Sequence, residues 1–166
     1  GYPSPPDMSA DIPALARTPA LVVSSGVKSL LDVAATVEVL ETLAIPVLGF
    51  RTDTLPLFYA ADGGPPVPQR VEEPAEAAAI AKAHWEIGGA GLLLGNPPPE
   101  SLDVGELIEQ AVAAASEKGV SGQDVTPFVL SFLPDRSDGR TRDVNRALIV
   151  ANARLAAEVA VAFAAL

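Results

Sequence analysis

Residues 19–32 read PALVVSSGVKSLLD and contain the pattern that decides the fold. The apolar, partly β-branched run in this stretch predicts a short buried strand over residues 19–25. After Gly26 the apolar residues recur at helical spacing, which predicts a helix over residues 28–43. Lys28 therefore stands at a strand-to-helix junction. Ligands gather at such junctions in open α/β sheets, so Lys28 is the first candidate functional residue.

The same succession of apolar runs, turns and helical patterns continues along the chain. Two more strands and five more helices are predicted, the strands over residues 46–52 and 91–97 and the helices over residues 10–17, 73–88, 104–119, from Thr126 onward and 141–166. This alternation is typical of an α/β fold with a mostly parallel sheet flanked by helices. Three strands are few for a self-standing sheet. We therefore interpret residues 1–166 as the C-terminal portion of a single domain that lacks its N-terminal part here.

The composition of the chain argues against several function classes. Of its 166 residues, 49% are hydrophobic, and 11 Lys and Arg against 21 Asp and Glu give a net charge of −10. Nucleic-acid binding needs clustered Lys and Arg, and a basic membrane-surface segment is equally absent. The chain has no cysteine, which excludes disulfides and thiolate chemistry. Because no signal peptide or uninterrupted run of 18 apolar residues is visible, we expect a cytoplasmic protein without a membrane partner.

The position of Lys28 suggests covalent chemistry. A helix N-terminus and apolar walls both disfavour the ammonium ion and so favour the free amine. A free amine can attack a carbonyl carbon and form a Schiff base. The residue pattern alone leaves two alternatives open, a lysine that binds phosphate and a lysine that extends to solvent.

A second candidate site lies in the stretch PPDMSAD, residues 5–11. The carboxylates of Asp7 and Asp11 are the kind of ligand that hard divalent ions such as Mg²⁺ and Mn²⁺ accept beside a phosphate. Ser9, with nearby backbone N–H groups, could hold an anion. The alternative is purely structural, an Asp turn followed by Ser9 as the N-cap of a helix over residues 10–17.

Taken together, several motifs resemble the pseudouridine-5′-phosphate glycosidase family, also known as the indigoidine synthase A-like proteins. The resemblance runs through the whole chain in order and rests on DMSAD, VVSSGVKSLLD, VEVLETLAIPVLGFRTDTLPLFY, PVPQRVEEPAE, GGAGLLLGNPPPE, VTPFVL and VNRALIVANARLAAEVA. It implies an enzyme that cleaves the C–C glycosidic bond of pseudouridine 5′-phosphate, giving uracil and ribose 5-phosphate. It also implies a divalent metal, typically Mn²⁺.

The same resemblance implies roles for six residues. The nucleophilic lysine of the family falls on Lys28, which would form an imine with C1′ of the ring-opened sugar. An active-site asparagine falls on Asn145, and the metal-binding aspartate falls on Asp7. The substrate-binding residues are Ser9, Ala10 and Asp11. A C-glycoside has no acetal oxygen to protonate, so the usual route through two carboxylates is unavailable, and an iminium at C1′ supplies the electron sink that C–C cleavage needs.

The resemblance also implies partners. The general-acid glutamate and a second substrate-binding lysine of the family lie in an N-terminal half that this sequence does not contain. We therefore expect the fragment alone to be inactive and to need that half. The family is typically a homotrimer, and the substrate would be a phosphorylated sugar or nucleotide.

Two alternative functions remain open. Residues 1–6 read GYPSPP where the family usually has a His-Arg-Gly-Ala-Glu type of stretch. The reactive residues of the family are retained here, whereas the neighbouring stretch differs. This combination would suit a C-ribosylating synthase that joins ribose 5-phosphate to an aromatic natural-product precursor. A non-catalytic partner subunit is the other alternative, although retention of every recognisable reactive residue argues against it.

Overall fold

The computed structural model describes residues 9, 11–28, 32–120 and 124–166. In chain order its elements are α1 (Ile12–Leu15), β1 (Leu21–Ser24), α2 (Val33–Thr42), β2 (Val47–Phe50), β3 (Gln69–Val71), α3 (Pro74–Glu86), β4 (Leu92–Gly95), α4 (Gly105–Glu117), α5 (Val125–Arg136) and α6 (Arg140–Ala164). The strands form one sheet in the order β1-β4-β2-β3, and every neighbouring pair is parallel. The predicted α/β fold with a parallel sheet and flanking helices is confirmed.

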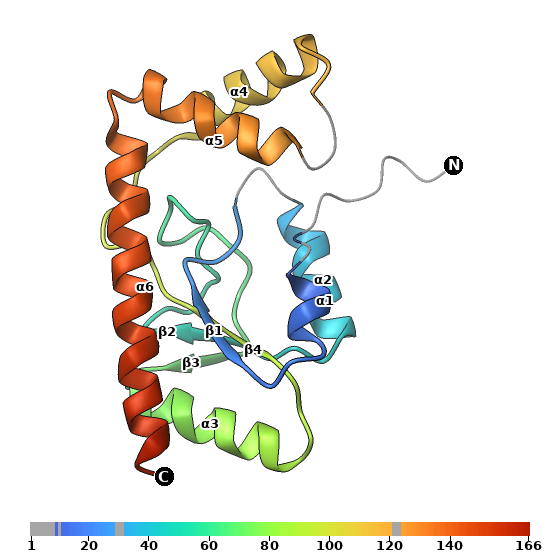
Figure 1. The fold of residues 1–166 in the computed structure, drawn as a ribbon, viewed down its shortest axis with the longest axis vertical. Helices are drawn as coiled ribbons and strands as arrows, with labels where there is room; N and C mark the ends of the chain where they lie inside the picture. Colours follow the sequence, from blue (N-terminus) through green and yellow to red (C-terminus); the bar gives the residue numbers. More distant parts are fainter. Residues whose placement is uncertain (1–8, 10, 29–31, 121–123) are drawn as a thin grey trace.

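Helices cover both faces of the sheet (Figure 1). Successive strand residues point to opposite faces. On one face, Leu92 and Leu94 of β4 pack in a core cluster with α3 and the C-terminal half of α6. On the other face, Leu93 packs in a second cluster with Ile12 of α1 and Leu40 of α2. The continuous apolar run of β4 is therefore explained by its burial on both faces.

A third apolar cluster lies beyond the sheet. It joins α4 and α5 to the N-terminal half of α6 through Ala111, Val129 and Leu148, with Tyr59 from the loop after β2. Figure 1 shows α4 and α5 at one end of the molecule and α6 running from that end along the sheet. The long helix α6 therefore ties this helical cluster to the sheet.

The sheet has one more strand than the sequence predicted. Strand β3 lies within the stretch that follows residues 46–52 and that reads as a proline-rich loop, because Pro65, Pro66 and Pro68 come just before it. Only Val71 of this three-residue strand is buried. Prolines are tolerated beside an edge strand, and β3 becomes a strand only through its pairing with β2.

Helix α2 begins at Val33, so the prediction that it starts at residue 28 is wrong. Asp32 is its N-cap, and the Asp32 side chain accepts a hydrogen bond from the backbone N–H of Ala35 at 2.9 Å. An aspartate that caps a helix has extended backbone geometry itself, which ends the helical pattern on its N-terminal side. Lys28 therefore lies in the loop between β1 and α2, outside the helix.

Helix α6 is, among the described residues, the one helix that is long and apolar enough to cross a membrane by length and composition. Its apolar part nevertheless carries Arg154 and Glu158, and its Leu155 and Val159 are buried in the core cluster with the sheet. These contacts are those of a core helix in a folded domain, so the length of α6 is weak evidence for a membrane span.

The burial of Tyr59 predicts a loss of stability at alkaline pH. Tyr59 is 6% exposed, and desolvation raises the pKa of its phenol above the ordinary value of 10.0. The folded state therefore holds this proton more tightly than the unfolded state, so the free energy of unfolding falls as the pH rises above about 10. Urea unfolding between pH 9 and 11 should show a steeper loss of stability for the native chain than for Tyr59→Phe. If stability fell equally steeply with pH in both proteins, the buried phenol of Tyr59 would not be the cause of the loss.

Candidate functional site

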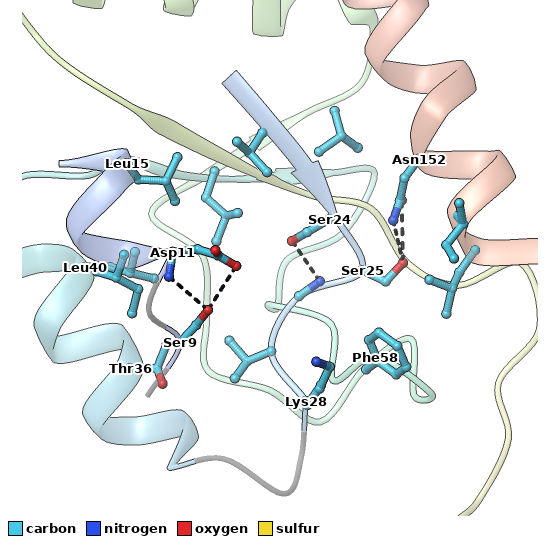
Figure 2. Close-up of a pocket in the computed structure, with 18 of the residues that line it drawn as sticks. Ser9, Asp11, Leu15, Ser24, Ser25, Lys28, Thr36, Leu40, Phe58 and Asn152 are labelled. Atoms are coloured by element: carbon cyan, nitrogen blue, oxygen red, sulfur yellow. Dashed lines mark hydrogen bonds between the residues drawn. The ribbon is translucent and has the colours of Figure 1, made fainter. Parts of the chain in front are cut away.

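A pocket of about 490 Å³ opens at the carboxyl end of β1 (Figure 2). Its walls come from the start of α1, the loop after β1, α2 and the N-terminal half of α6. This place agrees with the rule that ligands bind outside the carboxyl ends of parallel strands. Apolar side chains such as Val22 and Leu93 line much of it. Among the described residues, Lys28 is the one cation that lines the pocket.

The loop that carries Lys28 is fixed by backbone contacts to the segment 56–58. Gly26 has a φ of +80°, and a Cβ added there would lie 1.7 Å from the carbonyl oxygen of Pro56. The N–H of Val27 donates to that oxygen at 3.1 Å, and the N–H of Phe58 donates to the carbonyl oxygen of Ser25 at 2.9 Å. Only glycine combines this dihedral angle with this close approach. The position of Lys28 is therefore set by a defined turn.

The side chain of Lys28 is half-buried, and its Nζ lies 5.8 Å from the centroid of the Phe58 ring. Figure 2 shows Lys28 and Phe58 next to each other at the pocket, with Ser9 and Asp11 on one side and Ser25 and Asn152 on the other. An amine in this place can reach a ligand that enters between these two sides. The structure thus places Lys28 beside a pocket at the carboxyl end of β1, and its chemical role stays a prediction.

Ser9 and Asp11 lie together at the pocket, on the N-terminal side of α1. The Ser9 hydroxyl donates to Oδ2 of Asp11 at 3.1 Å and accepts from the Asp11 N–H at 3.3 Å. The prediction that Ser9 caps a helix over residues 10–17 is wrong, because α1 is shorter and Asp11 is its N-cap residue. The local bond to Asp11 occupies Ser9 instead. Both side chains offer oxygen atoms to the pocket.

The metal prediction falls on Asp7, which lies outside the described residues, as does Ala10. Within the described ranges, no group of three or more His, Asp or Glu side chains is placed to hold a metal ion. Ser9 and Asp11 supply oxygen donors, the type that Mn²⁺ and Mg²⁺ accept. These two side chains fit a supporting position beside such an ion, but they are too few to bind one alone.

Asn145 of α6 lines the pocket, and so does a second asparagine, Asn152, which the sequence analysis missed. The Asn152 amide donates to Oγ of Ser25 at 3.1 Å and its Oδ1 accepts from Nδ2 of Asn96 at 3.0 Å. Ser25 directly follows β1 and Asn96 directly follows β4. The Asn152 amide thus joins α6 to two neighbouring strand ends.

A signal for Asn152 was present in the sequence. Asn152 follows Asn145 by seven residues, which is close to two helical turns, so both amides lie on one face of α6. Two amides on one face of a helix rich in Ala, Val and Leu indicate a polar contact on that face. The partners of Asn152 could not be read from the sequence because they lie 127 and 56 residues away.

Loss of the Asn152 amide should destabilise the fold. The substitution Asn152→Ala leaves the Ser25 hydroxyl, on a residue 3% exposed, without its partner. A buried polar group left unpaired costs about 1–3 kcal/mol. Chemical unfolding should show a loss of that size for Asn152→Ala. The matched variant Asn145→Ala should lose less, since its side chain makes no hydrogen bond within the described residues. Equal losses would contradict this account of Asn152.

The family model of the indigoidine synthase A like proteins matches residues 1–162. The chain belongs to this family. This match confirms the resemblance seen in the sequence, and it covers nearly the whole chain.

Three relatives of the indigoidine synthase A-like family illustrate the similarity. The pseudouridine-5′-phosphate glycosidase of Thermus thermophilus is 48% identical over 168 residues, which cover 99% of this chain and 60% of that protein. The crystal structure of the prealnumycin C-glycosynthase AlnA in complex with ribulose 5-phosphate superposes with a TM-score of 0.84 at 35% identity. The superposition covers 96% of this chain and 54% of AlnA.

The indigoidine synthase A-like protein of Thermotoga maritima superposes with a TM-score of 0.83 at 41% identity, over 96% of this chain and 55% of that chain. The two solved structures confirm the fold. This chain spans about half the length of the family members that it matches. The similar proteins thus include one named as a glycosidase and one named as a C-glycosynthase.

Proposed function

We propose that this chain supplies the nucleophile-bearing half of an enzyme that makes or breaks a C–C bond between C1′ of ribose 5-phosphate and a base. The observation that carries the proposal is the position of Lys28. Its amine lies in a pocket at the carboxyl end of β1, and Ser9, Asp11 and Asn145 line the same pocket. These are the four described residues to which the family resemblance gives a role, and they come from three separate parts of the chain.

The proposed reaction begins with addition of the Lys28 amine to C1′ while the ring oxygen leaves with a proton. The nitrogen lone pair then forms the C=N bond as the bond between C1′ and the base carbon breaks. The electron pair of that bond stays on the base carbon, which takes up a proton and leaves as uracil. Water hydrolyses the remaining imine, releasing ribose 5-phosphate and the free amine. Run in reverse, the same steps join a base to the sugar.

The polar groups of the pocket would orient the sugar phosphate. We assign Ser9, Ala10 and Asp11 to substrate binding and Asn145 to hydrogen bonding at the reacting end of the sugar. Asp7 would hold Mn²⁺, or another divalent cation such as Mg²⁺, and the oxygen donors of Ser9 and Asp11 suit that neighbourhood. When bound, the ion would offset the charge of the phosphate.

The active unit that we propose is larger than this chain. Family members are about twice as long as this chain. The additional part of their chain, which this sequence lacks, would supply the general acid and a second substrate-binding lysine. A homotrimer is the assembly that the family resemblance suggests. The exposed apolar residues Val150 and Val161 on α6 are suited to a subunit contact. Membership of a family of metabolic enzymes supports a cytoplasmic location.

A biosynthetic direction is the second candidate function. The similarity to AlnA, a C-glycosynthase, supports it, as does the departure from the family pattern in residues 1–6. In that case the acceptor would be an aromatic natural-product precursor, and C–C bond formation would be the working direction.

The two directions are separated by one assay on a preparation that contains both halves of the family chain and Mn²⁺. Release of uracil from pseudouridine 5′-phosphate supports the glycosidase. A new C–C-linked product from ribose 5-phosphate and an aromatic acceptor, detected by mass spectrometry, supports the synthase. Folded protein that does neither would contradict the enzymatic proposal and favour a non-catalytic subunit.

A further inference from the structure

Phe58 has an unusual backbone conformation next to Lys28. Its φ is +68°, in the left-handed region that a bulky side chain rarely adopts. Such strain persists only where the surroundings fix it, and it is common where a protein must hold a group in one place. The observation therefore raises the question of what the Phe58 ring does.

Two contacts of Phe58 and one of its neighbour Leu57 fix this turn. The N–H of Phe58 donates to the carbonyl oxygen of Ser25 at 2.9 Å, which joins it to the loop that carries Lys28. Leu57, the preceding residue, donates its N–H to the carbonyl oxygen of Ala60 at 2.9 Å. The ring of Tyr59 packs edge-on against the Phe58 ring at a centroid distance of 4.8 Å. The left-handed turn therefore directs the Phe58 ring to a defined place.

That place is beside the Lys28 amine. The 5.8 Å between Lys28 Nζ and the ring centroid lies within the range in which an aromatic face attracts a cation. Phe58 and Lys28 both line the pocket, and Figure 2 shows them side by side there. No acidic side chain forms an ion pair with Lys28 within the described residues. The ring is thus a neutral group able to stabilise positive charge on the nitrogen.

We propose that Phe58 is a positioning residue, whose ring holds the Lys28 nitrogen in the pocket and stabilises the positive charge on it as the imine forms. This inference rests on the proposed function, in which Lys28 is the nucleophile. A neutral ring suits this task better than a carboxylate would, since it attracts a cation without binding the amine in an ion pair. The strained turn at Phe58 keeps the ring next to the Lys28 amine.

The test compares rates of imine formation at Lys28. The preparation with both halves is mixed with ribose 5-phosphate, and borohydride traps the imine as a stable secondary amine. Phe58→Leu should slow trapping about tenfold, a size typical of a partly desolvated cation–π contact. The sugar phosphate concentration for half-maximal rate should change less than about twofold, since charge on nitrogen and not sugar binding is altered. Phe58→Tyr, which keeps the ring, should restore the rate.

The matched control is Phe128→Leu. Lys118 Nζ lies 5.2 Å from the centroid of the Phe128 ring, so this variant removes a similar pair away from the pocket. It should leave the trapping rate at Lys28 unchanged. Equal trapping rates for the wild type and a folded Phe58→Leu variant would overturn the proposal. A wild type that forms no Lys28 adduct would overturn the proposed function itself.

A second measurement avoids any loss of fold in Phe58→Leu. Phenylalanine with one, two or three ring fluorines in place of Phe58 keeps the shape of the side chain and weakens the negative face of the ring stepwise. The trapping rate should fall at each step. A rate that stays constant across the series would show that the ring only fills space, and would overturn the proposal.

Discussion

Replacing Lys28 with alanine is expected to abolish both imine formation and C–C bond cleavage or formation. The chain has three lysines, Lys28, Lys82 and Lys118, and only Lys28 lines the pocket. Loss of a covalent nucleophile typically lowers kcat on the order of 10⁴-fold or more, because no other group can form the intermediate. The measurement is product release by the preparation with both halves, alongside circular dichroism to show that the variant is folded.

The control for this substitution is Lys118→Ala. Lys118 lies at the C-cap of α4, outside the pocket, so its loss removes one positive charge and leaves the site intact. Activity of Lys118→Ala should match the wild type. If Lys28→Ala kept most of its activity while folded, Lys28 would not be the nucleophile.

The substitution Gly26→Ala is expected to have the largest effect on the fold near the site. Alanine would place its Cβ 1.7 Å from the Pro56 carbonyl oxygen, at a φ of +80° that L-residues rarely adopt. The turn must open, and it would then lose the hydrogen bond from Val27 to Pro56. We expect a loss on the order of 3 kcal/mol in the free energy of unfolding, the range of severe backbone strain.

Gly88→Ala is the matched control for this loss. Gly88 has a φ of +86°, but a Cβ there would meet nothing within 4 Å. Its loss should therefore be about 1 kcal/mol, the cost of the left-handed conformation alone. The difference between the two variants in urea unfolding measures the steric part. Equal losses would show that the close approach of Pro56 to Gly26 does not hold the loop of Lys28.

The features that the sequence predicted well are those with a local signal. The apolar run around Val23 and the helical spacing that follows predicted the strand and, within a few residues, the helix. The expectation that this strand is buried is wrong, because β1 lies at the edge of the sheet and Val22 is 39% exposed. Parallel strands place their carboxyl ends at one edge of the sheet, so the position of Lys28 beside a pocket followed from topology alone. The cap at Asp32 moved the start of α2 because one side-chain hydrogen bond decides where a helix begins.

The features that the sequence did not predict depend on contacts between distant residues. Strand β3 exists through its pairing with β2 across a proline-rich segment. The network of Asn152, Ser25 and Asn96 needs the packing of α6 against two strand ends. The Phe58 ring reaches Lys28 only because the turn after β2 returns to the loop after β1. The spacing of Asn145 and Asn152 indicates a polar face on α6, but the partners in these contacts have no local pattern that periodicity or composition could show.

The most direct test of the central claim is to locate the trapped adduct. Protein with both halves present is incubated with ribose 5-phosphate and Mn²⁺, reduced with borohydride, and analysed by intact mass and peptide mapping. The account predicts one ribosyl phosphate adduct, on Lys28. No adduct on folded protein, or an adduct on Lys82 or Lys118 instead, would contradict the claim that Lys28 is the covalent nucleophile.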